Sequence, residues 1–145
     1  MDPDPGSPGS PGAPGPAYVD PRDVPAVTRV LSDVVAATGL PGLLDLVGRL
    51  PGARVDPGVA KGLFRAGTPA STWLGPENRL LLVPGGAGPQ LEHQHVVGGI
   101  TLARDLLGPD RAPGVLARLV GPVVGAVGGL EEATAVLSAY AELYP

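Results

Sequence analysis

The sequence contains no cysteine, which excludes disulfides, thiolate catalysis and cysteine-ligated zinc or iron–sulfur centres. Aromatic residues make up only 3% of the chain, so sugar binding by ring stacking is not expected. Ten basic residues against fourteen acidic ones leave a net charge of −4. This sign is wrong for generic binding to nucleic acids or anionic membranes, and we expect partners of neither class.

A secretory signal and a long apolar run are missing as well. The first residues, MDPDPGSPGS, have neither the basic nor the apolar region of a signal peptide. The most apolar segment, residues 115–130, is interrupted by Arg118, Pro122 and four glycines. It therefore falls short of the roughly 18 apolar residues that a membrane-spanning helix needs. We expect a cytoplasmic protein.

Glycine (23 residues), proline (19) and arginine are abundant instead. Their codons are GC-rich, so a GC-rich genome, such as an actinobacterial one, accounts for part of this bias. Each single glycine or proline is then a weaker sign of a turn than usual. In residues 1–20, however, proline and glycine are so dense that a disordered tail is expected. Recognition of this tail by an aromatic-lined groove is an alternative.

Residues 21–145 are expected to form a single domain that begins with two helices. Asp23 can cap the first helix, and Pro25 is tolerated in its first turn. Gly39 is suited to a left-handed cap that closes this helix. A second, short helix is expected over residues 42–50, where leucine and valine leave little polar surface.

The last third of the chain is also expected to be helical. Asp110 is placed to cap a helix with a continuous apolar stripe, which Pro122 should kink or split. Residues 130–144 form the final helix, with two glutamates in its first turn.

The middle of the chain has the pattern of short strands bounded by glycine and proline. Three such runs are ARVD (53–56), ASTWL (70–74) and RLLLV (79–83). The residues GPEN (75–78) between the last two predict a hairpin turn. Trp73 and Phe64, each the single residue of its kind, are expected to anchor the core.

Helices, then strands, then helices indicate an α+β fold rather than alternating β-α units. We expect a small antiparallel sheet of three or four strands, with both C-terminal helices packed on one face. Helices gathered on one face leave the other uncovered, so that other face is expected to be polar or to meet a partner.

The stretch LEHQHVVGG (91–99) holds both histidines of the chain. As a helix it would carry Gly98 and Gly99 in its interior, at a cost of about 1 kcal/mol each. The β-branched pairs on either side of these glycines favour an extended chain. We therefore prefer a strand over residues 91–104, in which the glycine pair marks a bulge or a close backbone approach, and the sequence leaves a helix as the alternative.

In a strand, His93 and His95 point to the same side, while Glu92 and Gln94 point to the other. Two such imidazoles can reach one divalent metal ion, and a carboxylate would have to complete the site. The carboxylates considered are Asp56, Glu77 and Asp105. An acid–base site is another possibility. The favoured interpretation is structural, with half-exposed histidines on a sheet face that meets a helix or a second subunit.

Motifs for other chemistry are incomplete. The loop in residues 80–90 has neither the third glycine nor the lysine of a phosphate-binding loop, and no G-x-S-x-G nucleophile motif occurs. No cofactor is predicted apart from the divalent metal considered above.

Three functions follow in order of preference. The first is a non-catalytic cytosolic interaction or accessory module, self-associating as a homodimer through the sheet or the valine-rich C-terminal helix, or binding another protein. The second is a small metal-binding or acid–base enzyme centred on Glu92, His93 and His95, with Arg104 or Arg79 as an anion clamp. The third is a binder of a small apolar ligand in a pocket between sheet and helices.

Metal binding by the two histidines predicts that added zinc or nickel raises the melting temperature, because the ion binds only the folded chain. The double substitution His93→Ala and His95→Ala should abolish this rise. Thermal denaturation with and without metal measures it, and an unchanged melting temperature up to millimolar metal contradicts the metal site.

Overall fold

Three helices and one five-stranded antiparallel sheet form the part of the chain that this computed structural model describes, residues 18–64 and 66–145. In chain order the elements are α1 (Val24–Gly48), β1 (Ala53–Asp56), β2 (Ser71–Leu74), β3 (Asn78–Val83), β4 (Gln90–Val97), β5 (Ile100–Leu107), α2 (Ala112–Ala126) and α3 (Leu130–Leu143). The predicted α+β class is confirmed, and the sheet has one strand more than the upper estimate. The predicted tail falls largely on residues 1–17, outside the described residues. Val19, within the predicted tail, is already buried, and its N–H donates to Ser138 Oγ at 3.1 Å.

Helix α1 contains both predicted N-terminal helices, joined at a kink. The Asp23 carboxylate accepts a hydrogen bond from the Ala26 N–H at 3.2 Å, as its capping position predicts. Gly39 has a φ of 78° inside the element, and Pro41 follows it. Because neither residue fits a regular helix interior, the axis changes direction there.

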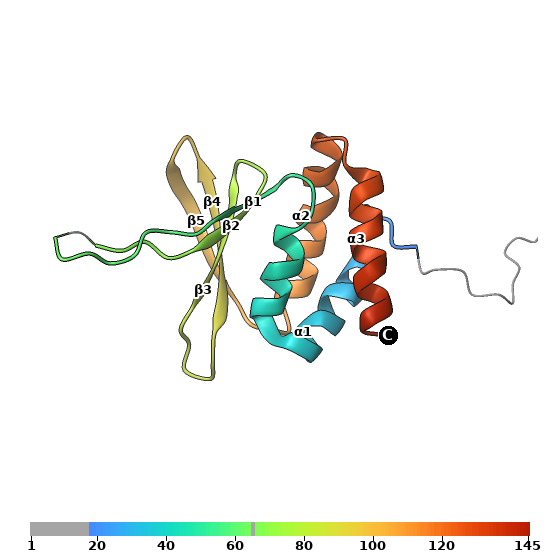
Figure 1. Cartoon of the computed structure of the whole chain (residues 1–145), viewed down its shortest axis with the longest axis horizontal. Helices are drawn as coiled ribbons and strands as arrows, with labels where there is room; N and C mark the ends of the chain where they lie inside the picture. The colour runs from blue at the N-terminus through green and yellow to red at the C-terminus, as the bar shows by residue number, and fades with distance from the viewer. Residues whose placement is uncertain (1–17, 65) are drawn as a thin grey trace, which may run out of the picture.

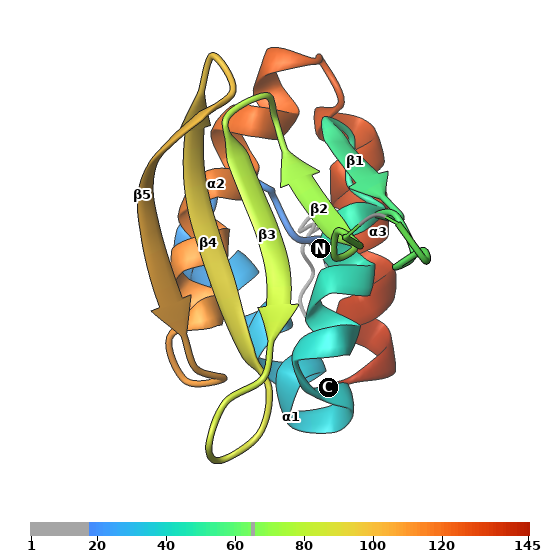
Figure 2. The same ribbon diagram turned by 90° about the vertical axis from the view of Figure 1, so that its left-hand side faces the viewer.

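The strands are joined in the simplest order, β1-β2-β3-β4-β5, each antiparallel to the next (Figure 2). The predicted hairpin turn between β2 and β3 is confirmed at Gly75–Glu77. The prediction of one strand over residues 91–104 is wrong in one respect, because the chain turns back at Gly98-Gly99. Both glycines have positive φ, 59° and 80°, which suits a two-residue hairpin turn. The bulge lies instead between His95 and Val96.

The C-terminal helices differ from expectation in two details. Asp110 does not cap α2; Arg111 occupies the cap position, with no side-chain hydrogen bond. Pro122 lies inside α2, which continues through it as one helix to Ala126. Helix α3 begins at Leu130 with two glutamates in its first turn, as predicted.

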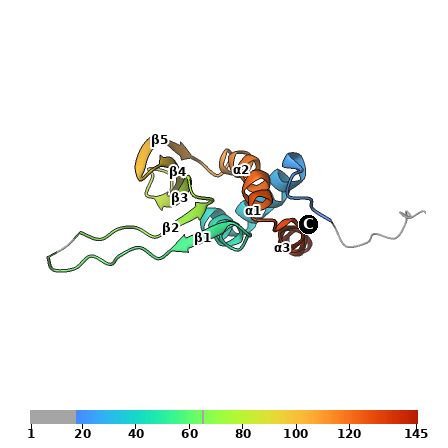
Figure 3. The same ribbon diagram turned by 90° about the horizontal axis from the view of Figure 1, so that it is seen from above.

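All three helices lie on one side of the sheet (Figures 1 and 3). We call the side facing them the inner face and the opposite side the outer face. Helices α1 and α2 contact the sheet, whereas α3 packs against α1 and α2 on their far side. The expectation that both C-terminal helices lie on the sheet is therefore wrong for α3. Leucines and valines from all these layers form one core, in which Leu31, Leu43, Leu80, Leu91 and Leu116 are fully buried.

Trp73 and Phe64 are not the core anchors that the sequence predicts. Trp73 precedes Leu74, which is buried on the inner face, so alternation places the indole on the outer face, half-buried. Phe64 is 95% exposed and Leu63 is 89% exposed. Both belong to residues 57–64 and 66–70, which we call the arm. Val59 and Thr68 form a β-bridge within the arm, which projects away from the helices (Figures 1 and 3).

Helix α1 is long and apolar enough to cross a membrane, judged by length and composition alone. Eight of its residues are buried in the core described above. Core helices of soluble proteins pass the same test, and α1 has the contacts of such a helix with α2, α3 and the sheet.

A glycine in the turn between α1 and β1, Gly52, is expected to tolerate alanine less well than Gly86 in the loop between β3 and β4. Gly52 has a φ of 87°, and a Cβ there would lie 2.8 Å from Val123 Cγ1 and 3.0 Å from the Val123 carbonyl oxygen. Gly52→Ala should therefore lower the free energy of unfolding by about 1–3 kcal/mol. Gly86 meets no atom within 4 Å and is the control. Urea denaturation compares the two, and equal stabilities of G52A and G86A would contradict the close contact with α2.

Candidate functional site

The two imidazoles lie side by side on the inner face of β4. His93 is opposite Leu80 of β3 and Asp105 of β5, and residues directly opposite one another share a face. Leu80 is fully buried, which assigns this face to the core side. The predicted extended chain, with both rings on one side, is therefore present in the structure.

Each ring has a polar partner from a neighbouring segment. His93 Nε2 lies 3.0 Å from Asn78 Oδ1, and His95 Nε2 lies 3.2 Å from Glu77 Oε1. The Asn78 amide nitrogen donates to the Leu74 carbonyl at 3.3 Å, so its Oδ1 is the acceptor for His93 Nε2–H. These contacts tie the start of β3 to β4 and occupy the Nε2 atom of both rings.

The environment of His93 favours its neutral form. Burial lowers the pKa of His93 below its ordinary value of 6.5, and the charge of His95 lowers it further. The Asp105 carboxylate across the strand pair opposes this shift by raising the pKa. Because burial is the largest cause, the ring is an uncharged hydrogen-bond donor at neutral pH.

The structure does not complete a metal site around the two histidines. Among residues 18–64 and 66–145, no three histidine, aspartate or glutamate side chains are grouped so that they could hold an ion. Asp56 lies on β1 at the other edge of the sheet, where it accepts from the Gly58 N–H at 2.9 Å. Glu77 contacts the His95 ring, and Asp105 is opposite His93 in the strand pairing, so each carboxylate lies near only one ring.

Glu92 and the two arginines considered as an anion clamp lie on the other side of the sheet. Glu92 alternates with the histidines along β4 and accepts a hydrogen bond from the Gln94 amide on the outer face. Arg79 and Arg104 are both opposite Gln94. The thickness of the sheet thus separates Glu92, Arg79 and Arg104 from His93 and His95, and the five side chains do not converge.

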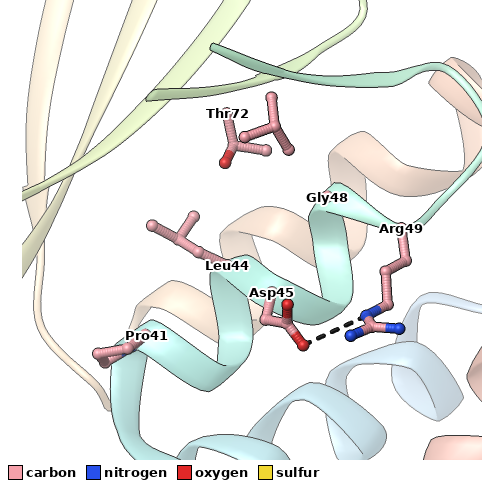
Figure 4. A pocket seen from close by; sticks show the side chains of 7 residues that line it. Pro41, Leu44, Asp45, Gly48, Arg49 and Thr72 are labelled. Atoms are coloured by element: carbon pink, nitrogen blue, oxygen red, sulfur yellow. Dashed lines mark hydrogen bonds and ion pairs between the residues drawn. The ribbon is translucent and has the colours of Figure 1, made fainter. Parts of the chain in front are cut away.

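An open hollow of about 430 Å³ lies between α1 and strands β1 and β2 (Figure 4). Its lining residues are Pro41, Leu44, Asp45, Gly48, Arg49, Val55 and Thr72. At its rim the Asp45 carboxylate accepts from Arg49 Nε at 3.2 Å and from the Tyr140 hydroxyl at 3.3 Å. The hollow has an apolar floor and no nucleophile paired with a base, so it could hold an apolar group but offers no catalytic pair.

Comparison with protein-family models, curated proteins and solved structures finds no match to this chain. Its function is therefore inferred from its own geometry. One feature that sequence reasoning missed is a contact on the outer face, where the Arg54 guanidinium lies 5.2 Å from the centre of the Trp73 ring. The positions of Arg54 and Trp73 in two predicted strands are the signal that could have revealed it.

The lowered pKa of His93 predicts an acid-sensitive contribution to stability. The unfolded chain binds a proton at this residue near pH 6.5, whereas the folded chain binds it only at a lower pH. His93 therefore costs no stability well above pH 6.5, and the free energy of unfolding falls as the pH decreases from there towards the folded-state pKa.

Denaturation curves between about pH 5.5 and 8 measure this effect, since carboxylates stay ionised in that range. His93→Gln keeps a donor for Asn78 and should flatten the decline, while His95 is present in both proteins. Asp105→Asn removes the charge that raises the pKa of His93 and should steepen the decline. Parallel curves for H93Q and the parent protein would contradict the buried, neutral imidazole.

Proposed function

We propose that the chain is a non-catalytic cytosolic interaction module that self-associates through strand β5. The observation that supports this most directly is the exposure of β5, in which all residues but Leu107 are exposed. Strand β5 is the last strand of the sheet, paired only with β4 in the described part of the chain. An edge strand of this length presents unpaired backbone donors and acceptors to which another strand can bind.

The side chains of this edge are unusually apolar for a surface. Ile100, Leu102 and Leu106 are 65%, 61% and 52% exposed. Natural edge strands are commonly protected by charges or proline, and here the charged residues are only Arg104 and Asp105. Covering three large aliphatic side chains would stabilise an assembly by a few kcal/mol, at about 1.5–3 kcal/mol for each fully buried side chain.

A second copy is a suitable partner for this edge. Two β5 strands can pair antiparallel about a two-fold axis perpendicular to the sheet, so that each copy provides the same surface. The two five-stranded sheets would then form one continuous sheet, with the helices of both copies on the same side. The backbone groups of each edge would find partners without any change within the subunits.

The arrangement of the side chains capable of acid–base chemistry supports a non-catalytic role, because they do not converge on one site. Both histidines have partners on the inner face, and Glu92 lies on the outer face. A cytosolic location is supported by the lack of cysteine and by the many core contacts of α1.

Self-association through β5 predicts an apparent mass near twice 14.5 kDa in light scattering. Leu102→Lys places a charge on the exposed edge and should shift the protein to the monomer, with its melting temperature little changed at high dilution. The matched control is Leu143→Lys on α3, where the leucine is 67% exposed. A monomeric parent protein at high concentration, or equal loss of association in both variants, would refute the proposal.

A further inference from the structure

The outer face carries a row of three arginines, one tryptophan and one glutamine that crosses the whole sheet. Strand pairing places Arg54 opposite Trp73, Trp73 opposite Arg79, Arg79 opposite Gln94 and Gln94 opposite Arg104. One residue comes from each of the five strands, which lie side by side in Figure 2. We call these five residues the outer-face row. With strands about 4.8 Å apart, the three arginines follow one another at intervals of about 10 Å.

Contacts within the row hold its side chains in place. Arg54 stacks over the Trp73 ring, and Arg79 Nη1 donates to Gln94 Oε1 at 3.2 Å. Gln94 is only 5% exposed, although the face is not covered by any helix. Gln94 is therefore buried beside Arg79, while the Arg54 and Arg104 side chains remain exposed.

The positive charges of the row have no ion-pair partner among the described residues. Ion pairs there join Arg22 to Asp20, Arg49 to Asp45 and His95 to Glu77. The outer-face carboxylates nearest the row along the strands are Asp56 and Glu92, and each accepts a hydrogen bond from another group. In the described part of the chain, the row thus carries three arginines without an ion pair, of which Arg54 and Arg104 are exposed and Arg79 is half-buried, on a chain whose net charge is −4.

The arm adds an apolar element beside this face. It projects from the ends of β1 and β2 on the side away from the helices, and Figures 1 and 3 agree on this direction. Leu63 and Phe64 are its most exposed apolar side chains, at 89% and 95%. Sheet and arm therefore meet at an angle, with positive charge on the sheet and apolar side chains on the arm.

We propose that the outer-face row and the arm form a docking surface for an acidic segment of a partner protein. The guanidinium groups of Arg54, Arg79 and Arg104 pair with carboxylates of that segment, because their planar donors match carboxylate oxygens. Leu63 and Phe64 cover apolar side chains of the same segment.

The observations favour a polypeptide over a nucleic acid. The row has a single aromatic ring, whereas single-stranded nucleic acids are bound by successive stacking rings along a basic groove. Arg104 lies on β5, but the row binds through side chains and not through the backbone edge of that strand, so this inference does not require self-association.

Fluorescence anisotropy with a short labelled oligoglutamate peptide tests the row. The parent protein should bind it more weakly as salt is raised. Arg54→Glu with Arg104→Glu should weaken binding by about tenfold or more, because two exposed guanidinium groups are replaced by carboxylates that repel the peptide. The control is Arg111→Glu with Arg118→Glu, which makes the same change of net charge at two exposed positions, the N-cap of α2 and a site within α2. Its affinity should stay within about twofold of that of the parent protein.

A peptide of the same length that alternates glutamate with leucine tests the arm. Phe64→Ser should weaken binding of this peptide and leave oligoglutamate binding unchanged. Circular dichroism and melting temperatures of all variants establish that they fold. The proposal is overturned if the parent protein does not bind oligoglutamate, if both double variants lose affinity equally, or if oligothymidylate of equal charge binds more tightly.

Discussion

Leu80, Leu91 and Leu107, from three adjacent strands, are fully buried in the core that the sheet shares with α1 and α2. Their burial determines which face of every strand points inwards, since side chains alternate along a strand and align across strand pairs. The two imidazoles then lie on the core side and the arginines on the solvent side. A shift of one residue in the pairing of β4 would turn His93 and His95 to the outer face and Glu92 and Gln94 to the inner face, so the position of the histidines depends on these leucines.

The proposed binding surfaces use different parts of the same sheet. Edge pairing through β5 uses backbone groups, whereas the outer-face row uses side chains perpendicular to the sheet. A two-fold axis perpendicular to the sheet would leave the outer faces of both copies on one side. Two rows would then lie next to each other, and an acidic partner could contact both subunits at once.

Much of the local structure was predictable because it depends on neighbours in the chain. The capping carboxylate of Asp23 and the hairpin turn at Gly75–Glu77 follow from residue types whose geometry is local. The glycine pair Gly98-Gly99 is also a local pattern, but glycines in a strand are typical both of a two-residue hairpin turn and of a bulge. Positive φ at both glycines resolves this choice, and it turns one predicted strand into two.

By itself the sequence determined the α+β class, because the order of helical and extended segments is visible in short patterns. For LEHQHVVGG it favoured a strand, with His93 and His95 on one side, but left a helix open, and the pairing of β4 with β3 and β5 decided between them. Only the tertiary structure decided that Trp73 faces outwards, that Phe64 lies on a projecting arm and that Arg54, Arg79 and Arg104 share one row. These features depend on strand register and on which face the helices cover. Both are set by contacts between residues far apart in the chain, and the pattern of a single segment does not contain them.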